Sequence, residues 1–143
     1  MYQIRRIDGM EHIDLLHYMN GFEPGRFPEL QSLHFTKGLW WIAQIQDGTV
    51  VGFAGLVPCA PFDNVAYLKR AYVLPQHRGN GLQRDFIKVR EEAARALGMR
   101  QIVTECCGDN LASQANLRHE GYVECTPEQP WGEPGSIYFV KRL

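Results

Sequence analysis

Short stretches of the chain alternate apolar and polar residues or are dense in β-branched and aromatic residues, and both patterns are typical of strands. Four such stretches lie in the first half of the chain: Tyr2–Ile7, Leu39–Gln46, Thr49–Val57 and Ala66–Leu74. The second and third meet at Asp47-Gly48, a dipeptide that predicts a two-residue hairpin turn. We therefore expect the front half of the sheet to be largely antiparallel.

Other stretches repeat their apolar residues at steps of three and four, which is the spacing of one face of a helix. Glu11–Met19 has this pattern, and Glu29–Phe35 is expected to form a second short helix after the loop Gly21–Pro28. A longer helix follows Gly81, and Gly98 is placed to end it. Its predicted apolar stripe consists of Leu82, Phe86, Val89, Ala93 and Leu97.

The last third of the chain predicts one more helix between strands. Gln101–Cys106 is a strand candidate, and Asp109 or Asn110 can cap a helix that runs to about Glu120. The two final strands are expected at Tyr122–Cys125 and Ile137–Lys141. The full order is β-α-α-β-β-β-α-β-α-β-β, which predicts a single α/β domain over residues 1–143. Its central sheet is mixed, mostly antiparallel and flanked by helices.

Composition adds limits to this picture. The chain has 143 residues, 45% of them apolar, which suits one compact domain with a buried core. The formal net charge of -1 does not favour a nucleic-acid partner, because such partners normally need a basic face. We find no apolar run of the ~20 residues that a membrane span needs and no signal peptide. We therefore expect a cytoplasmic protein without a membrane partner.

The cysteines give no sign of a metal site. None of the four belongs to a C-x-x-C pair, and no histidine lies at zinc-finger spacing from them. We expect reduced, mostly buried thiols and no bound metal. The four residues are Cys59, Cys106, Cys107 and Cys125.

A glycine-containing turn, Gln76-His77-Arg78-Gly79-Asn80-Gly81, joins the strand that ends at Pro75 to the long helix. Backbone amides in such a turn lack partners, and the helix dipole adds positive potential there, so the turn suits a phosphate or pyrophosphate. The side chains of His77, Arg78 and Arg84 can add donors or charge. A turn whose glycines serve only packing is the alternative that these residues leave open.

Two common phosphate-binding motifs do not fit this turn. A Walker loop needs Lys followed by Ser or Thr, which is missing here. A dinucleotide fingerprint needs a third Gly or Ala at position 84, where this chain has Arg, and it also needs a parallel βαβ chain. The hairpin at Asp47-Gly48 contradicts that chain order.

The segment Tyr72-Val73-Leu74-Pro75-Gln76-His77-Arg78-Gly79-Asn80-Gly81-Leu82 resembles the signature of the GNAT superfamily of N-acetyltransferases. In that superfamily a strand with V-x-P leads to [QR]-x-x-G-x-[GA] and a long helix. Asn110-Leu111-Ala112-Ser113, followed by Gly121-Tyr122, resembles its second signature, N-x-x-[SA] with G-[FY]. The order of elements fits from Tyr2 to Leu143, so the resemblance covers the chain and implies a GNAT-like domain.

The resemblance implies acetyl-CoA as cosubstrate. Its pyrophosphate would lie on the turn, at Gln76, His77, Arg78, Gly79, Asn80, Gly81 and Leu82. The pantetheine arm would follow the backbone of the preceding strand at Ala71, Tyr72 and Val73, as β-augmentation by a small molecule. That strand must then separate from Gln101–Cys106. Asn110 and Ser113 would flank the pantetheine or the departing thiol.

The implied reaction is direct attack of an amine on a thioester. A lysine-like amine of pKa ~10.4 is mostly protonated near neutral pH, so a general base assists the reaction. Glu105 is the base candidate, because the apolar alternation of its strand turns it away from the helix and toward the acetyl group. Some members of the superfamily have a glutamate base at the matching position. A solvated or ion-paired strand glutamate is the alternative.

The remaining catalytic roles stay open. A backbone N–H near Tyr72 or Val73 can bind the developing oxyanion. Many members of the superfamily have a tyrosine acid where this chain has Leu117, and Tyr72, Tyr67 or Cys107 is available as a substitute. Protonation of the thiolate by water is a further route.

The acceptor is expected to be the primary amine of a small molecule or peptide. Trp40 and Trp41 and the loops Gly21–Pro28 and Pro127–Pro134 are the expected walls of its site. Acidic residues in the loops would favour a cationic amine, although ordinary surface charges explain them as well. A non-catalytic acyl-CoA-binding or regulatory module is the alternative function, and a protein-binding module using Trp131 is a third. Whether the chain forms a homodimer is left open.

Overall fold

The computed structural model describes residues 1–60 and 62–143, and it contains the predicted order of strands and helices. The strands are β1 (Gln3–Ile7), β2 (Leu39–Gln44), β3 (Val50–Pro58), β4 (Val65–Val73), β5 (Gln101–Cys107), β6 (Val123–Cys125) and β7 (Ser136–Arg142). The helices are α1 (Ile13–Asn20), α2 (Ser32–Lys37), α3 (Leu82–Ala96) and α4 (Leu111–His119), with a 3-10 turn, η1, at Pro75–His77.

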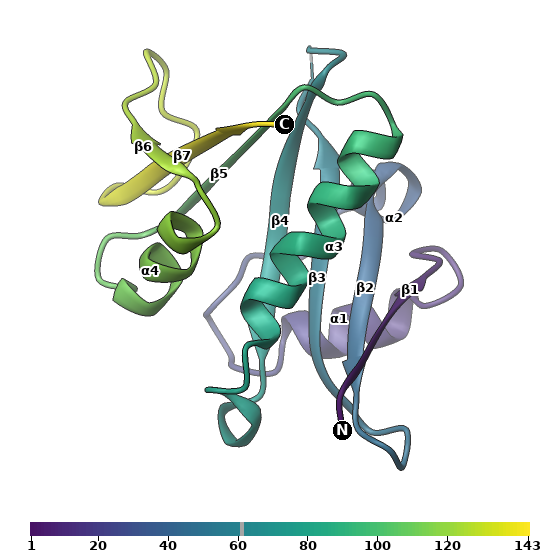
Figure 1. Ribbon diagram of the computed structural model, residues 1–143. Coiled ribbons are helices and arrows are strands. Elements are labelled where there is room, and N and C mark those ends of the chain that lie inside the picture. Colours follow the sequence, from purple (N-terminus) through teal and green to yellow (C-terminus); the bar gives the residue numbers. More distant parts are fainter. Residues whose placement is uncertain (61) are drawn as a thin grey trace.

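All seven strands belong to one sheet in the order β1-β2-β3-β4-β5-β7-β6. The pairings are antiparallel except that of β4 with β5, so the prediction of a mixed, mostly antiparallel sheet is confirmed. In Figure 1, α3 covers the near face of the sheet while α1 and α2 lie behind it. The core is dominated by the strands at its centre, β2, β3 and β4, with fully buried residues such as Trp40, Phe53 and Tyr72.

The sheet opens between β4 and β5. Their pairing covers only Val65–Tyr67 against Gln101–Val103, and beyond it the strands diverge, with β5, β7, β6 and α4 turning away from β4 (Figure 1). β4 also has a bulge near the opening. Arg70 is the extra residue of this bulge and lies opposite the step from Ala54 to Gly55 on β3. Arg70 has a positive φ of 57°, which is uncommon for a residue with a side chain.

A buried arginine of α3 holds this bulge. The Arg90 side chain is almost fully buried, and its Nη1 donates to the carbonyls of Gly55 and Arg70, at 3.1 Å each. Its Nε donates to the carbonyl of Phe86 at 2.9 Å, and burial lowers the pKa of Arg90 to about 10. The guanidinium thus satisfies carbonyls that the irregular pairing leaves inside the fold.

The inward face of α3 differs from the predicted apolar stripe. Leu97 is 60% exposed, whereas Arg90 and Ala94 are buried. The prediction followed apolar residue type alone and so passed over a charged residue that points inward. The helix ends as predicted at Gly98, whose φ is 77° and whose amide donates to the Arg95 carbonyl.

The β2–β3 connection lies one residue earlier than predicted. The Gly48 amide donates to the Ile45 carbonyl at 3.0 Å, which places Gln46 and Asp47 at the centre of the turn. The predicted two-residue turn needs positive φ at both of its central residues, and Asp47 does not have it. Gly48, with φ 88°, follows the turn, while the Asp47 carboxylate accepts from the Thr49 amide at 2.9 Å.

The expectation of mostly buried cysteines was wrong. Cys107 is exposed and the other three cysteines are half-buried, and all four are free thiols. The reason is the opening in the sheet, since Cys106 and Cys107 line the groove between β4 and β5.

Candidate active site

The separation of β4 and β5 creates a groove of about 1020 Å³. Its walls come from β4, β5, α3, α4 and the loops after α1 and β6. Ala71, Glu105, Asn110 and Ser113, which the sequence predicts to be site residues, all line it. The opening required for a thioester arm beside β4 is therefore part of the fold.

The glycine turn presents a row of backbone donors. Gly79 and Gly81 have φ of 81° and 80°, a conformation that glycine adopts without strain. Among residues 1–60 and 62–143, no acceptor is bonded to the amides of residues 79–84, which include the first turn of α3. A Cβ at either glycine would meet no atom within 4 Å. Unpaired amides at a helix N-terminus fit a diphosphate.

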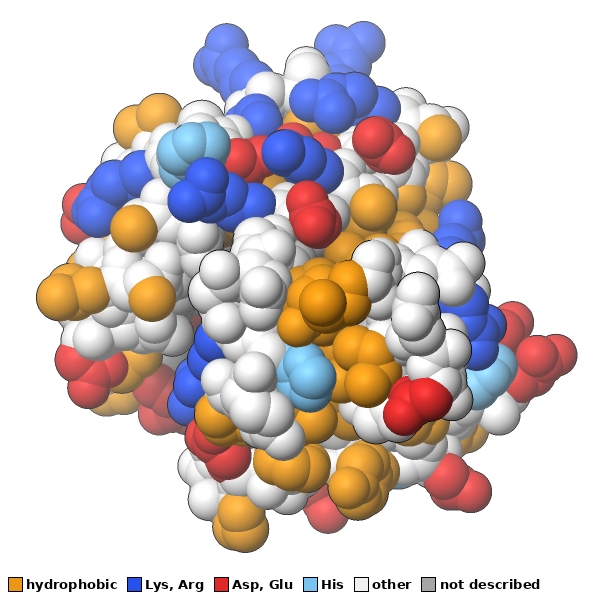
Figure 2. All heavy atoms as spheres, turned by 60° about the horizontal axis from the view of Figure 1, so that its bottom comes forward, with side chains coloured by type: hydrophobic (Ala, Val, Ile, Leu, Met, Phe, Trp, Pro, Cys, Tyr) orange, Lys and Arg blue, Asp and Glu red, His pale blue; other side chains and the backbone are white. Residues whose placement is uncertain are grey.

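Side chains of the turn stabilise it rather than join this row. The side-chain nitrogen of Asn80, Nδ2, donates to the carbonyls of His77 and Arg78. His77 Nδ1 is 3.1 Å from the Tyr2 hydroxyl. Arg78 Nε donates to the Val73 carbonyl at 2.9 Å. These side chains already have partners within the chain, so the available donors of the turn are main-chain amides. Figure 2, which brings the lower edge of Figure 1 forward, has side chains of both charges interspersed over that face.

Tyr72 does not present its hydroxyl to the groove. The side chain is 2% exposed and packs against Phe22 and Phe27 of the loop after α1. Its hydroxyl donates to Glu23 Oε1 at 2.5 Å, and burial followed by the Glu23 contacts raises the pKa of Tyr72. A catalytic role of the Tyr72 side chain is therefore not supported, because an acidic partner already occupies the hydroxyl. Its neighbour Ala71 lines the groove instead.

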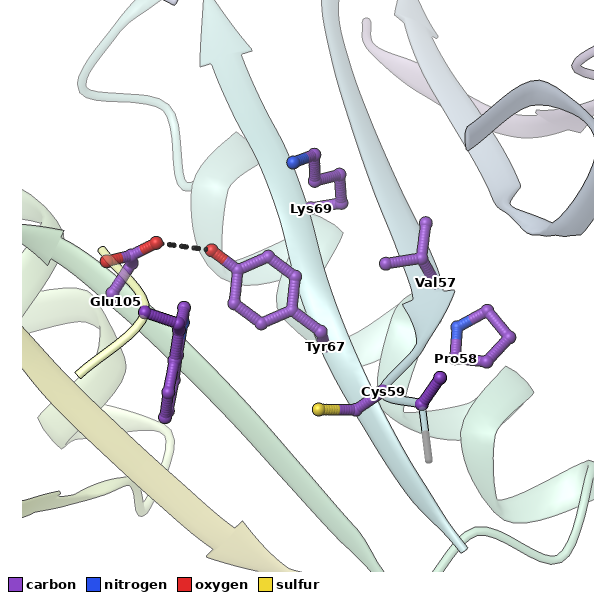
Figure 3. Close-up of a pocket in the computed structure, with 8 residues that line it drawn as sticks. Val57, Pro58, Cys59, Tyr67, Lys69 and Glu105 are labelled. Atoms are coloured by element: carbon purple, nitrogen blue, oxygen red, sulfur yellow. Dashed lines mark hydrogen bonds between the residues drawn. The ribbon is translucent and has the colours of Figure 1, made fainter. Parts of the chain in front are cut away.

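Glu105 lies just beyond the last paired residues of β4 and β5. The Tyr67 hydroxyl reaches across from β4 and donates to Glu105 Oε1 at 2.9 Å (Figure 3). The other carboxylate oxygen, Oε2, is buried and has no hydrogen-bond partner within the described chain. Burial, and then the negative charge of Glu105, raise the pKa of Tyr67, which keeps the phenol protonated as a donor.

The loop between β6 and β7 closes over this carboxylate. Tyr138 of β7 is paired with Glu105 of β5. Trp131 packs edge-to-face against the Tyr138 ring, with ring centroids 4.6 Å apart. The Gly132 amide donates to the Tyr138 hydroxyl at 2.9 Å. A side chain at Gly132 would overlap the Glu105 carboxylate, so only glycine fits here without a shift. The sequence pointed to Trp131 in this loop, but nothing in it marked Gly132 or Tyr138.

A smaller cavity of about 310 Å³ adjoins Glu105. Its polar lining comes from Tyr67, Lys69 and Glu105, and its apolar lining includes Val57, Pro58 and Trp131 (Figure 3). The volume is near the lower end for small-molecule sites. Lys69 was not among the predicted site residues, because a lone lysine in a strand carries no recognisable signal.

The first turn of α4 completes the groove. Asn110 caps the helix by accepting from the Ser113 amide at 3.1 Å, which is the predicted capping interaction. Leu117, at the position where relatives often have a tyrosine, is buried and also lines the groove. No hydroxyl is therefore supplied from that position.

An opened sheet, a glycine turn with free amides at a helix N-terminus and a carboxylate at the opening together define an acyl-CoA-dependent acyltransferase site. The family model of the acetyltransferase (GNAT) family matches residues 7–122. The chain belongs to this family, as the resemblance implied.

Among curated proteins, an IAA acetyltransferase of Azospirillum brasilense is 29% identical over 99 residues, which are 68% of this chain and 64% of that protein. This match therefore spans less than two thirds of the relative. A ribosomal-protein-alanine N-acetyltransferase of Brucella melitensis has a TM-score of 0.75 at 23% identity, covering 99% of both chains. The structure of yncA from Salmonella typhimurium with its cofactor acetyl-CoA has a TM-score of 0.76 at 16% identity, covering 99% of this chain and 93% of that one. At such identities the two structures establish the fold alone.

Proposed function

We propose that this chain transfers the acetyl group of acetyl-CoA to the primary amine of a small molecule, with Glu105 accepting the amine proton. The observation that carries the proposal is the buried Glu105 oxygen without a partner, located where β4 and β5 separate. Leaving a buried carboxylate half-satisfied is costly in a fold that has no use for it. The Glu105 residue lines a cavity large enough for a small amine.

In this proposal acetyl-CoA lies in the groove between β4 and α4. The amides of residues 79–84 bind its diphosphate, and the backbone of Ala71–Val73 runs beside the pantetheine arm. Asn110 and Ser113 line the groove on the other side. This arrangement brings the thioester to the end of the β4–β5 pairing, close to Glu105.

The chemistry follows from the carboxylate and its surroundings. The amine nitrogen forms a bond to the acetyl carbon, the carbon–sulfur bond breaks, and CoA leaves as a thiolate. Making the amine neutral near pH 7 costs roughly 4.6 kcal/mol, and a positioned base typically contributes about 10²- to 10⁴-fold in rate. Tyr67 holds one oxygen of Glu105 and so fixes the carboxylate at the opening between the strands.

The first test addresses acetyl-CoA binding at the turn. We expect Gly79→Glu and Gly81→Asp to abolish binding in a calorimetric titration, because each places a carboxylate where the diphosphate would lie. Gly48→Glu is the matched control, since Gly48 also has a positive φ and open space around it but lies in the β2–β3 turn. Undiminished binding by both turn variants would show that the diphosphate is elsewhere.

The second test addresses the base. We expect Glu105→Gln to lower kcat by about 10²-fold or more while the Kd for acetyl-CoA stays the same. Glu124→Gln, a change on the exposed surface of β6, is the control. Release of CoA thiol with a panel of amines is the assay. If acetyl-CoA binds but no amine releases the thiol, the chain is a non-catalytic acyl-CoA-binding module.

A further inference from the structure

We propose that the acceptor is a small amine that also carries a carboxylate, and that Lys69 binds this carboxylate while Glu105 faces the amine. The proposal rests on the proposed function and names the substrate class of the same site. Of the acidic loop residues that could favour a cationic amine, Glu23 is already paired with Arg26 and lies 3.6 Å from Arg78.

Lys69 and Glu105 carry opposite charges and line the same cavity. Tyr67 of β4 is paired with Val103 of β5, so two residues further along the parallel strands Lys69 lies on the opposite side of the opening from Glu105. Both line the same 310 Å³ cavity, and Figure 3 has them on the two strands that flank it. Despite their opposite charges they form no ion pair within 4.0 Å in the part of the chain that the structure describes.

Lys69 lies over the Tyr67 ring but has no hydrogen-bond or ion-pair partner among the described residues. Its ammonium lies 5.8 Å from the centre of the Tyr67 ring, and it donates no hydrogen bond to a described residue. The adjacent Arg70, in contrast, donates to Asn20 and to the carbonyl of Pro28. Burial, and then the nearby Arg70 charge, lower the pKa of Lys69, so an anion in the cavity would relieve an unfavourable position.

The charges and the apolar lining of the cavity together indicate which ligand it fits. One ammonium facing one carboxylate matches a ligand with one negative and one positive group, whereas a phosphate dianion would be repelled by Glu105. Val57, Pro58 and Trp131 supply an apolar wall. An amino acid with an apolar side chain has the negative group, the positive group and the apolar surface that this lining fits.

Matched acceptors test the proposal. Leucine, methionine and phenylalanine are each compared with their amides and with the corresponding amines that lack the carboxylate, using CoA-thiol release. We expect kcat/KM for the amino acids to exceed that of the amides and amines by about 10- to 100-fold, chiefly through KM. The less basic amine of the amide works against this outcome, so a preference over the amides cannot come from amine reactivity.

The Lys69→Met variant separates the carboxylate site from the rest of the machinery. We expect it to lose most of the preference for amino acids over amines without a carboxylate, and to bind acetyl-CoA normally. Lys69→Arg should restore part of the preference. Lys88→Met, on the exposed side of α3, is the control for removing a lysine charge.

Two outcomes would overturn the proposal while leaving the acetyltransferase function intact. One is that amines lacking a carboxylate are acetylated as well as or better than the amino acids. The other is that Lys69→Met lowers turnover of all acceptors equally. If no acceptor of any kind releases CoA thiol, the proposed function itself fails, and that result is distinguishable because acetyl-CoA titration is measured in parallel.

Discussion

At the scale of single residues, the site depends on which partners a carboxylate has and lacks. Tyr67 satisfies one oxygen of Glu105, and Gly132 leaves just enough room for the other. Neither residue belongs to a recognisable motif, yet together they hold the carboxylate at the opening of the sheet. Because a side chain at position 132 would displace this carboxylate, we expect the identity of residue 132 to affect the proposed role of Glu105.

We predict that Gly132→Ala lowers kcat by about tenfold or more with little loss of stability. The added methyl group displaces the end of the flexible Glu105 side chain, which is an inexpensive movement that misplaces the base. Steady-state kinetics with a thermal melt of the same sample checks this. Gly21→Ala is the control, because its Cβ would make only an ordinary 3.4 Å contact. Unchanged kcat in Gly132→Ala would argue against Glu105 as the base.

A second prediction at this scale concerns acid stability. The Tyr72 hydrogen bond, and then the charge of Arg26, hold the pKa of Glu23 below its reference value of 4.5. A depressed folded-state pKa contributes stability above the unfolded pKa, and this contribution is lost as pH falls through the folded-state pKa. We expect melting temperatures of the unmodified protein to fall more steeply than those of Glu23→Gln between about pH 5 and about pH 3. Parallel curves for the two proteins would contradict the shift.

At the scale of elements, α3 and the β3–β4 pair depend on one another through Arg90. The bulge at Arg70 breaks the regular ladder, and the guanidinium from α3 supplies the donor for the carbonyls of Gly55 and Arg70. The same helix begins at the glycine turn. One helix thus supports both the opened strand and the amides proposed to bind the diphosphate.

We predict that Arg90→Met destabilises the protein by about 2–4 kcal/mol, because buried carbonyls lose their donor and the apolar side chain cannot replace it. Urea unfolding is the measurement. Arg84→Met on the exposed side of the same helix should change stability by less than about 0.5 kcal/mol. Equal effects of the two substitutions would mean that the bulge does not need the guanidinium.

At the scale of the whole molecule, the fold consists of two parts of one sheet that are paired through only a short parallel segment. The groove between them is where we place acetyl-CoA, so the ligand would contact both parts. None of the described helices is long and apolar enough to span a membrane. A cytoplasmic location, a preference against nucleic acid and the oligomeric state remain predictions.

We expect acetyl-CoA at about 100 times its Kd to raise the free energy of unfolding by about 2.7 kcal/mol. Hydrogen exchange should slow in β4, in residues 79–84 and at the start of α4, since the proposed site spans all three. Urea unfolding and exchange mass spectrometry with and without ligand are the measurements. The Gly79→Glu variant should gain neither effect, and protection confined to one side of the groove would contradict a bridging ligand.

Patterns in the sequence correctly predicted the order of the elements, the end of α3 at Gly98, the glycine turn and the family. These features are local, because hydrophobic periodicity, capping residues and motif spacing act over a few neighbouring residues. The predictions of the hairpin turn and of the inner face of α3 were partly wrong. Asp47 and Arg90 make contacts that residue type does not indicate.

Which side chains meet at the site depends on the tertiary structure. Tyr67 and Glu105 are 38 residues apart, and Gly132 comes from a third segment, so their contact depends on strand register and on where β4 and β5 separate. The same register places Lys69 opposite Glu105. The Tyr72 hydroxyl, in contrast, is bonded to Glu23 in the loop after α1. Side-chain partners across a sheet follow from packing of the whole domain, and one sequence contains no local signal for them.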